Sequence, residues 1–556
     1  MQFDAVLLAP RRAQMRSQGW WRDTTINDAL DQAAQQWPDR LALVGQRTGE
    51  GAAQSFNYAQ LARMADRVAI GLWRLGVRPA DVVACQLPNV WQFTVLYLAC
   101  ARIGAVFNPL MPIFRERELL FMLGHGEAKL IVVLKDFRNL DYEAMLKGIQ
   151  PQLPQLQHVV AIGAAGADSF EALLTQPAWE RDADAAQILG RHRILPDAIT
   201  QLIYTSGTTG EPKGVMHSSN TLMANIHAYA ERLALGGDDV VLMASPMAHQ
   251  TGFMYGLMMP VMLGATAVLL DVWNAATAAQ LIRRWRCSFT MASTPFLSDL
   301  SREVATSGAV PSLRTFLCAG APIPGPLVEQ AQAALGAQII SAWGMSENGA
   351  VTTTLPGDDA QRAVETDGLP LPGAEVKVLD DLGQERPRGE IGQLWVRANS
   401  NFGGYLKRPQ LNATTDDGWF DTGDQARIDA QGYIRITGRS KDVIIRGGEN
   451  IPVVEVEALL YKHPAVAQAA VVAYADERLG ERACAVIVLK PGAAEPALAD
   501  VTDFLRVQKL APHYLPERLV VLPEMPATPS GKIQKFKLRE QMKSALPKLD
   551  RVGRAR

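Results

Sequence analysis

"YTSGTTGEPKG", residues 204–214, is the stretch of the chain that decides its fold and its chemistry. It combines three glycines, four Ser or Thr hydroxyls and one lysine, and an apolar run that predicts a strand (198–207) leads into it. Glycines let backbone N–H groups turn toward an anion, hydroxyls donate hydrogen bonds and lysine adds positive charge, so the stretch suits a phosphate chain. It is not a Walker A loop, because Lys213 lies between Pro212 and Gly214, where that motif requires GK followed by Ser or Thr. A polar turn between two packed elements is the alternative.

Short apolar runs alternate with helical patterns on both sides of this stretch. Strands are expected at 81–87, 129–135, 240–245, 265–271 and 315–320, and a helix at 90–105. This alternation predicts an α/β fold with largely parallel sheets covered by helices. Ligands in such folds bind beyond the carboxyl ends of strands, where both 204–214 and the loop 318–324 are placed.

The character of the sequence changes near residue 365. Beyond it, short strands punctuated by Gly and Pro predict a β-rich subdomain, and a compact tail with two helices and two strands follows. The tail is long enough for a separate domain. We therefore expect a large N-terminal domain (1–438), a polar hinge (439–442) and a small α+β C-terminal domain (443–556).

The bulk composition is that of a soluble globular protein. Of 556 residues, 48% are hydrophobic and 20% charged, and the formal charge of 55 − 57 = −2 argues against an obligate nucleic-acid binder. Five cysteines without CxxC spacing favour reduced core thiols in a cytoplasmic protein. No secretory signal is expected. The uncharged run 252–270 is broken by Pro260 and Gly264, so it predicts a buried helix and strand in place of a transmembrane helix.

Further motifs extend the interpretation along nearly the whole chain. "YTSGTTGEPKGV" resembles the signature of the adenylate-forming (ANL) superfamily, which includes acyl-CoA synthetases, luciferases and peptide-synthetase adenylation domains. In the family's order, "AWGMSENGA" (342–350) resembles its YGxTE segment, "GWFDTGD" (418–424) its TGD segment, "GRSKDVIIRGGENI" (438–451) its hinge, and "PSGKIQKFKLR" (529–539) its terminal lysine motif. Trp343 stands where the family usually has tyrosine, and Ser346 where it has threonine.

The resemblance implies the ANL fold and a two-step reaction. A carboxylate attacks the α-phosphorus of ATP to give an acyl adenylate and pyrophosphate, and a thiol, that of coenzyme A, then attacks the adenylate. Glu347 is implied as a Mg²⁺ ligand, with a helix-capping glutamate as the alternative. Asp424 and Arg439 are implied to contact the ribose and the α-phosphate, with a structural salt bridge between them as the alternative. The residues implied to bind ATP or AMP are Thr205, Ser206, Gly207, Thr208, Thr209, Gly210, Lys213, Gly320, Ala321, Pro322, Trp343, Gly344, Met345, Ser346, Asp424 and Arg439.

Lys532 is implied as a catalytic residue whose ammonium meets the substrate carboxylate and the α-phosphate; a solvated surface lysine is the alternative. Because the same pocket must then admit a thiol, the resemblance implies a mobile C-terminal domain with its hinge at Lys441. The residues implied to line the path of coenzyme A are Arg446, Gly447, Gly448 and Glu449.

His249 is implied to act at the acyl site as a gate for the carboxylate, and a core histidine is the alternative. Phe253, Met254 and Met258 would form apolar, adaptable walls. No charged residue lies between His249 and Asp271, so an amino-acid substrate is not expected. The stretches "MAHQTGFMYG" (247–256), "TDGLPLPGAEVKV" (366–378) and "DERLGERACAVIVLK" (476–490) resemble bacterial short- and medium-chain acyl-CoA synthetases. The stretch "RRAQMRSQGWWRDTTINDALDQ" (11–32) adds to this resemblance and is also similar to ligases of alicyclic acids such as cyclohexanecarboxylate, which leaves a linear chain and a ring as alternatives.

Two other functions stay open. One is an adenylating enzyme that loads a carrier protein, although "LGGDD" (235–239) has Asp239 where a carrier's serine must stand. The other is a nucleotide-binding protein without catalysis, which the presence of Lys532, Glu347 and Asp424 disfavours. The expected partner is a small carboxylic acid, with ATP, Mg²⁺ and coenzyme A but no nucleic acid; a homodimer is left open.

Overall fold

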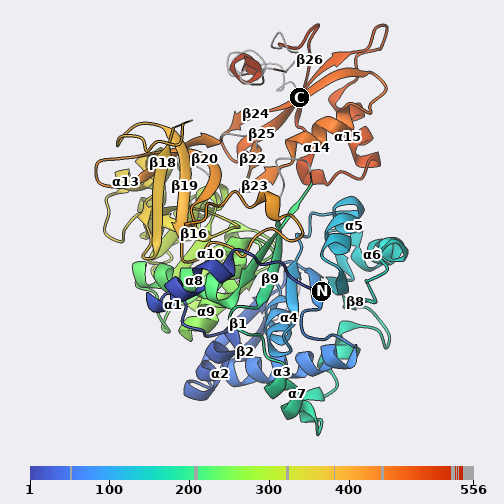
Figure 1. Cartoon of the computed structure of the whole chain (residues 1–556), viewed down its shortest axis with the longest axis vertical. Coiled ribbons are helices and arrows are strands. Elements are labelled where there is room, and N and C mark those ends of the chain that lie inside the picture. Colours follow the sequence, from blue (N-terminus) through green and yellow to red (C-terminus); the bar gives the residue numbers. More distant parts are fainter. Residues whose placement is uncertain are drawn as a thin grey trace. The chain divides into compact units, whose positions relative to one another are not determined.

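The computed structural model describes residues 1–49, 53–205, 211–320, 323, 325–380, 382–439, 444–526, 533, 535 and 537–542. This part of the chain divides into two compact units. Unit 1 comprises Met1–Pro112, Leu119–Thr205 and Lys213–Gly438. Of the described residues, unit 2 takes Ile113–Glu118, Glu211, Pro212 and those from Arg439 onward. Figure 1 shows the elements of both units.

The larger sheet of unit 1 has nine strands among the described residues, in the order β17-β16-β15-β14-β13-β11-β12-β1-β2. The six from β15 to β1 run parallel, whereas β2, β16 and β17 pair antiparallel at the edges. The strands are β1 (Leu41–Gln46), β2 (Gln54–Asn57), β11 (Val240–Met243), β12 (Thr266–Leu270), β13 (Phe289–Ala292), β14 (Thr315–Ala319), β15 (Gln338–Met345), β16 (Gly349–Thr353) and β17 (Leu369–Pro370). The inner strands are buried on both faces, which is why the sequence shows them as continuous apolar runs.

A second sheet of unit 1 has the order β10-β9-β4-β3-β5-β8. Its strands are β3 (Val82–Gln86), β4 (Val106–Pro109), β5 (Ala128–Leu134), β8 (His158–Ile162), β9 (Ile199–Thr205) and β10 (Lys213–Ser218). All neighbours are parallel except β10, which returns antiparallel to β9. The sequence did not predict β10: Lys213 is the first residue of a strand and does not stand inside a loop.

Helices of unit 1 cover both sheets. They are α1 (Leu8–Ser17), α2 (Ile26–Gln36), α3 (Tyr58–Arg74), α4 (Trp91–Arg102), α5 (Glu116–His125, which begins in unit 2), α6 (Tyr142–Ile149), α7 (Ala185–Arg191), α8 (Ser219–Arg232), α9 (Met259–Leu263), α10 (Ala275–Trp285), α11 (Thr294–Ser307), α12 (Gly325–Leu335) and α13 (Ala360–Glu365). π-helical turns occupy Glu171–Thr175 and Gly252–Met258, and 3₁₀ turns occupy Gln150–Gln152, Trp179–Arg181 and Pro409–Leu411. The apolar run 252–270 thus folds as helical turns followed by β12, as expected. Within the described ranges, no helix is both long and apolar enough to cross a bilayer.

The β-rich subdomain predicted after residue 365 is a four-stranded sheet. Its strands β18 (Ala374–Leu379), β19 (Gly392–Ala398), β20 (Phe420–Ile428) and β21 (Ile434–Arg439) follow one another in space as in sequence, and Figure 1 shows β18, β19 and β20 side by side. Leu394, Val396 and Ile434 form its core. A minor hairpin, β6 (Asp136–Phe137) and β7 (Leu140–Asp141), completes the strands described in unit 1.

Unit 2 is a small α+β unit built on the long hairpin of β24 (Val466–Asp476) and β25 (Gly480–Leu489). The hairpin is extended by β22 (Ile444–Arg446), β23 (Glu449–Ile451) and β26 (Arg518–Val521), and α14 (Val453–Leu460), α15 (Leu498–Val507) and a 3₁₀ turn at Pro512–Tyr514 complete the unit. All five cysteines of the chain are buried and unpaired, in keeping with reduced thiols. The predicted α/β fold with its β-rich part and its α+β C-terminal part is confirmed.

Candidate active site

Three residues expected in the site follow the carboxyl ends of parallel strands in the nine-stranded sheet. Gly320 follows β14, Glu347 lies just beyond β15, and the segment after β11 leads to His249. Because these strands are parallel, their carboxyl ends lie at one edge of the sheet. This edge is where ligands bind in open α/β folds.

A further group of expected residues lies outside the described part of the chain. It consists of Ser206, Gly207, Thr208, Thr209, Gly210, Ala321, Pro322, Lys441 and Lys532, together with the side chain of Arg439.

The opening stretch is carried by a β-hairpin. Thr205 at the end of β9 stands opposite Lys213 at the start of β10. The other side of β10 is paired as well, because Leu406 N donates to Gly214 O at 2.8 Å and Val215 forms a β-bridge with Tyr405. Both ends of the stretch expected to bind phosphate are therefore fixed in the sheet.

Lys213 and Glu347 meet through a tyrosine that sequence reasoning missed. The hydroxyl of Tyr405 accepts a hydrogen bond from Lys213 Nζ at 2.8 Å and donates one to Glu347 Oε1 at 2.6 Å. Lys213 Nζ lies 4.0 Å from Glu347 Oε1 and 4.0 Å from the centroid of the Tyr405 ring. Glu347 is 4% and Tyr405 2% exposed, so the hydroxyl joins a cation and a buried carboxylate in one polar chain.

Burial, and then the charge of Glu347 and the hydrogen bond to it, raise the pKa of Tyr405 well above its ordinary value. The hydroxyl therefore stays protonated and acts as the donor toward the carboxylate. Phe402 packs edge-on against Tyr405 with ring centroids 4.7 Å apart, in a cluster with Ile203 and Val215. In the sequence Tyr405 is one aromatic residue in the segment "NFGGYL", and only the pairing of this segment with β10 indicates its role.

The backbone next to the Glu347 carboxylate is held from two directions. Phe402 N donates to Glu347 O at 2.8 Å, and His217 Nε2 lies 2.8 Å from Ser346 O. Because a carbonyl only accepts, Nε2 carries the proton. Burial lowers the pKa of His217 to about 4, so the ring is neutral at ordinary pH and supplies this one donor.

Trp343 and Asp424, expected to contact the adenine and the ribose, are hydrogen bonded to each other. Trp343 Nε1 donates to Asp424 Oδ2 at 3.0 Å, and both side chains are buried. The indole packs in the same core as Val351 and Leu394. One carboxylate oxygen of Asp424 is thus engaged by the tryptophan that replaces the family's tyrosine, and the indole fixes the orientation of the carboxylate.

Gly344 is a position at which the fold itself requires glycine. A Cβ there would lie 2.0 Å from Gly349 O and 2.6 Å from Ala350 Cα, because β15 and β16 approach closely. The next residue, Met345, packs between two apolar clusters. Gly344 therefore permits the chain reversal that presents Ser346 and Glu347.

The residues expected at the acyl site are His249 and three residues that follow it, and their side chains have different neighbours. His249 is partly exposed, and its Nδ1 accepts from Thr251 N at 3.4 Å. The three residues expected as walls, Phe253, Met254 and Met258, are buried in the π-helical turns or beside them.

Of the three, Met254 is adjacent to Gly349, which follows shortly after Glu347. Its Sδ and Cε lie 3.0 Å from the position that a Cβ on Gly349 would take. Phe253 and Met258 instead contact Tyr97 of α4: the Phe253 and Tyr97 rings are 4.7 Å apart, and Tyr97 OH lies 3.7 Å from Met258 Sδ. The structure thus brings Met254 toward the site and packs the other two against α4.

Gln250 is a second residue that sequence reasoning passed over. Its Oε1 accepts from Gln201 Nε2 at 3.0 Å, and both side chains are buried. Gln201 belongs to β9, so this bond ties the segment after His249 to the strand that leads into 204–214. The available signal was a polar residue in the otherwise apolar stretch after His249.

In unit 2, the residues expected to line the thiol path form a tight hairpin. Gly447 and Gly448 have φ of +58° and +89° and connect Arg446 to Glu449, its partner across β22 and β23. Two successive positive φ values are those of a type I′ turn, which explains the glycine pair. Arg446 pairs with Glu517 at 2.5 Å and donates to a backbone carbonyl, so its guanidinium is engaged inside unit 2.

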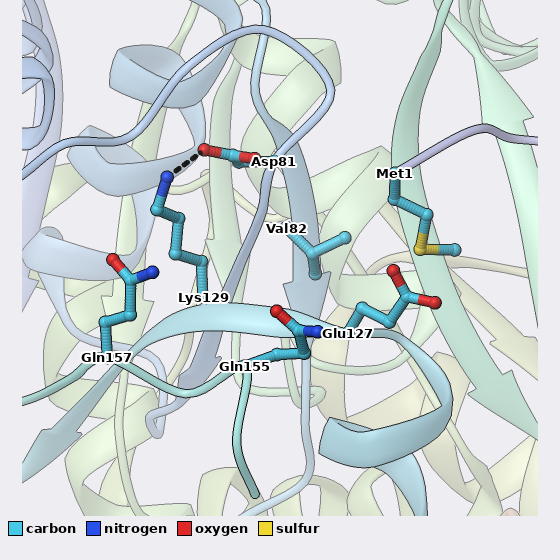
Figure 2. Close-up of a pocket in the computed structure, with 7 residues that line it drawn as sticks. All are labelled: Met1, Asp81, Val82, Glu127, Lys129, Gln155 and Gln157. Carbon is cyan, nitrogen blue, oxygen red and sulfur yellow. Dashed lines mark hydrogen bonds and ion pairs between the residues drawn. The ribbon is translucent and has the colours of Figure 1, made fainter.

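Unit 1 also contains a small polar cavity of about 110 Å³ (Figure 2). Lys129 and Asp81 form an ion pair of 2.7 Å in its wall, and Gln155 and Gln157 face it as well. These residues stand at or before the amino ends of β3, β5 and β8. Because β9 runs parallel to these strands, the cavity lies at the amino ends of the strands, whereas Thr205 stands at a carboxyl end. The cavity is therefore not the candidate active site.

Comparisons with known proteins show which family the chain is similar to. The sequence matches the family described as AMP-binding enzyme over residues 30–406 and the AMP-binding enzyme C-terminal domain over residues 455–532. A medium-chain fatty-acid–CoA ligase of Escherichia coli is 38% identical over 96% of this chain and 93% of the relative. A salicylyl-CoA synthase/salicylate adenylyltransferase of Streptomyces is 33% identical over 97% of each protein. The amide bond synthetase of Marinactinospora thermotolerans superposes with a TM-score of 0.81 at 26% identity, over 93% of this chain and 99% of that one.

Proposed function

The chain belongs to the AMP-binding enzyme family of AMP-forming acid–thiol ligases, and on this premise we propose that it joins a medium-chain or alicyclic carboxylic acid to coenzyme A. The observation that carries the proposal is the polar chain of Lys213, Tyr405 and Glu347 at the base of the phosphate-binding hairpin. The Escherichia coli relative, named a medium-chain fatty-acid–CoA ligase, supports this range of substrates. The uncharged segment after His249 supports an acid without a second charge.

In the first half-reaction a carboxylate oxygen attacks the α-phosphorus of ATP. A new P–O bond forms, the bond to the β-phosphate bridge breaks, and acyl adenylate and pyrophosphate result. Both reactants are anionic, so the site must supply cations and hydrogen-bond donors to the phosphate oxygens. Lys213 and the hydroxyl residues of 205–210 take this task, Asp424 accepts from the ribose, and Lys532 brings a second ammonium to the α-phosphate.

Glu347 fits a magnesium ligand. Mg²⁺ is usually held by one or two carboxylates plus substrate phosphates, and Glu347 offers such a carboxylate beside the hairpin. When bound, Mg²⁺ would neutralise charge on the phosphate oxygens.

In the second half-reaction the sulfur of coenzyme A attacks the acyl carbon. A C–S bond forms, the thiol loses its proton, and the C–O bond to AMP breaks. We expect the thiol to pass the Gly447-Gly448 turn, and Arg446 has to exchange Glu517 for the cosubstrate if it is to bind a phosphate. Lys441 serves as the hinge at which the C-terminal domain moves between the two half-reactions.

A panel of carboxylic acids tests the proposal. Acids from C2 to C12, cyclohexanecarboxylate and benzoate are compared by AMP formation that depends on coenzyme A. We expect the highest kcat/KM with medium-chain or alicyclic acids. Pyrophosphate release without any response to coenzyme A, but with transfer to a carrier protein, would favour the carrier-loading alternative, and no pyrophosphate release with any acid would contradict an enzyme.

A further inference from the structure

The N-terminal helix α1 carries an arginine whose hydrogen-bond acceptors are all backbone carbonyls; its guanidinium also lies over the Trp21 ring, 5.7 Å from the centroid. Arg11 Nη2 donates to Asn401 O at 2.6 Å and to Phe402 O at 3.0 Å, and its Nη1 donates to Ala398 O at 3.3 Å. Its Nε donates to Leu7 O at 3.0 Å. The guanidinium of α1 thus holds a loop that lies 387 to 391 positions later in the chain.

This arrangement is specific for arginine. Among the residues that the structure describes, no carboxylate lies within ion-pair distance of Arg11, and burial lowers its pKa to about 10. Withdrawing a cation from water without a counter-charge is costly unless each donor is paired. The planar fork of arginine reaches several carbonyls at once, which the single ammonium of lysine cannot reproduce.

The loop held by Arg11 is the one that fixes Glu347. The carbonyl of Phe402 accepts from Arg11, and the N–H of the same residue donates to Glu347 O at 2.8 Å. Three residues further on, Tyr405 donates to the carboxylate of Glu347. Phe402 therefore links Arg11 to Glu347, because its carbonyl group bonds to Arg11 and its N–H group bonds to Glu347.

Two more groups of the N-terminal segment hold the same loop. Leu7 N donates to Gly403 O at 3.2 Å, and Trp21 Nε1 donates to Asn399 O at 2.9 Å. Leu7 also packs against the apolar cluster that contains Phe402. The family match begins at residue 30, so this whole segment lies outside the matched region.

We propose that Arg11 is a positioning residue for Glu347, and that helix α1 in this way contributes to the binding of MgATP. The inference rests on the proposed function in one respect, the role of Glu347 toward Mg²⁺. It extends the site to a segment that no motif includes, and it assigns Arg11 no contact with a substrate.

The test compares Arg11→Ala and Arg11→Lys with Arg16→Ala in the full-length protein. Arg16 stands on the same helix, but its ion pairs with Asp23 and Asp197 lie at the surface, so it is a matched control. MgATP binding is measured by calorimetry without any acid, and each half-reaction is then measured separately. We expect Arg11→Ala to weaken MgATP binding and adenylation about three- to thirtyfold, the range typical of indirect coupling. Thioester formation from supplied acyl adenylate should change less than about twofold, Arg11→Lys should be intermediate, and Arg16→Ala should match the wild type.

Two results would overturn the proposal. One is unchanged MgATP binding in a folded Arg11→Ala variant. The other is an equal loss of rate in both half-reactions together with a lower melting temperature of the variant. If Arg11→Ala does not fold, Trp21→Phe removes one donor to the same loop while keeping an aromatic ring. This variant must then show the same result, a loss in adenylation without a matching loss in thioester formation. The binding measurement needs no acid substrate. A protein that binds MgATP but activates no acid would therefore contradict the proposed function and still leave the role of Arg11 measurable.

Discussion

A single hydroxyl group separates the ammonium of Lys213 from the carboxylate of Glu347. The two charged atoms are 4.0 Å apart, and Tyr405 OH bonds to both. Without the hydroxyl, we expect them to close into a direct ion pair, because an unpaired buried carboxylate is unfavourable. In the proposed mechanism, Lys213 would then be drawn away from the phosphates that it is expected to bind, and Glu347 from the expected metal.

Tyr405→Phe should therefore slow adenylation. Hydrogen bonds to charged groups contribute about 1.5–3 kcal/mol, which corresponds to roughly a ten- to hundredfold lower rate. Pyrophosphate release in single-turnover experiments measures this step. Thioester formation from supplied acyl adenylate should remain near the wild-type rate, since the outer phosphates have left by then.

Tyr433→Phe is the control for this substitution. Tyr433 OH also donates to a carboxylate, that of Asp358 at 2.9 Å, but it lies in the loop between β20 and β21. If both variants slow adenylation to the same extent, the hydroxyl of Tyr405 has no special role.

In the proposed mechanism, Lys532 supplies a positive charge to the α-phosphate in the first half-reaction. Lys532→Ala should lower adenylation by about a thousandfold or more, because a positioned cation at a developing phosphate charge is among the largest electrostatic contributions to catalysis. The second half-reaction should proceed from supplied acyl adenylate. Equal losses in the two half-reactions would show that the lysine acts in binding or folding.

At the scale of secondary structure, an ion pair fixes Lys535, which stands three positions after Lys532 in the sequence. Lys535 Nζ lies 2.8 Å from Glu457 Oε1, and Glu457 also accepts from Val471 N at 2.5 Å. The pair thus joins the C-terminal segment to α14 and β24. Ile533, which packs against the core of unit 2, provides a second attachment next to Lys532.

Lys535→Met should loosen this attachment while keeping the length of the side chain. We expect adenylation to fall about threefold to tenfold, since partly buried ion pairs seldom contribute more than about 1–2 kcal/mol, and thioester formation to be spared. Stopped-flow measurement of both half-reactions is the assay. Arg506→Ala, which breaks the exposed pair with Asp503 on α15, is the control and should leave both rates unchanged.

The elements that the sequence predicted share one property. β3, β5, β12 and β14 are continuous apolar runs, and the structure places each within about two residues of the expected bounds because full burial on both faces requires such runs. The strand β10 has no such run, since it begins with Lys213 and Gly214 and is fixed by its partners on both sides.

The site residues show the same limit of sequence reasoning. Motifs indicated Glu347 and Lys213 because their chemistry is local to a short pattern. Tyr405 and Arg11 act through partners far away in the chain, such as Arg11 with Asn401, 390 positions apart. No local pattern encodes such contacts. The roles expected for the site residues, those of Glu347 and Lys213 included, stay predictions.

At the scale of the whole molecule, the proposed mechanism places two half-reactions in one pocket, and we therefore expect a change of conformation between them. Lys441→Pro tests the hinge, because proline fixes φ near −65° and removes an N–H. Adenylation should persist within about threefold, whereas thioester formation should fall about tenfold or more if the backbone change occurs at this residue. The two rates are measured separately in the purified variant. Equal rates for the second half-reaction in variant and wild type would contradict a hinge at Lys441.

The pairing of residues 403–406 with β10 has a consequence for association between molecules. β10 is the last strand of its sheet, and backbone bonds from Gly403 to Met216 (2.7 Å) and from Leu406 to Gly214 (2.8 Å) occupy its outer side. At the opposite end of the sheet, Ala161 of β8 forms a bridge with Ser169. Free strand edges are templates for intermolecular β-pairing, and here short irregular segments cover part of both edges. The residues that hold Tyr405 in place thus also protect the chain from aggregation through this edge.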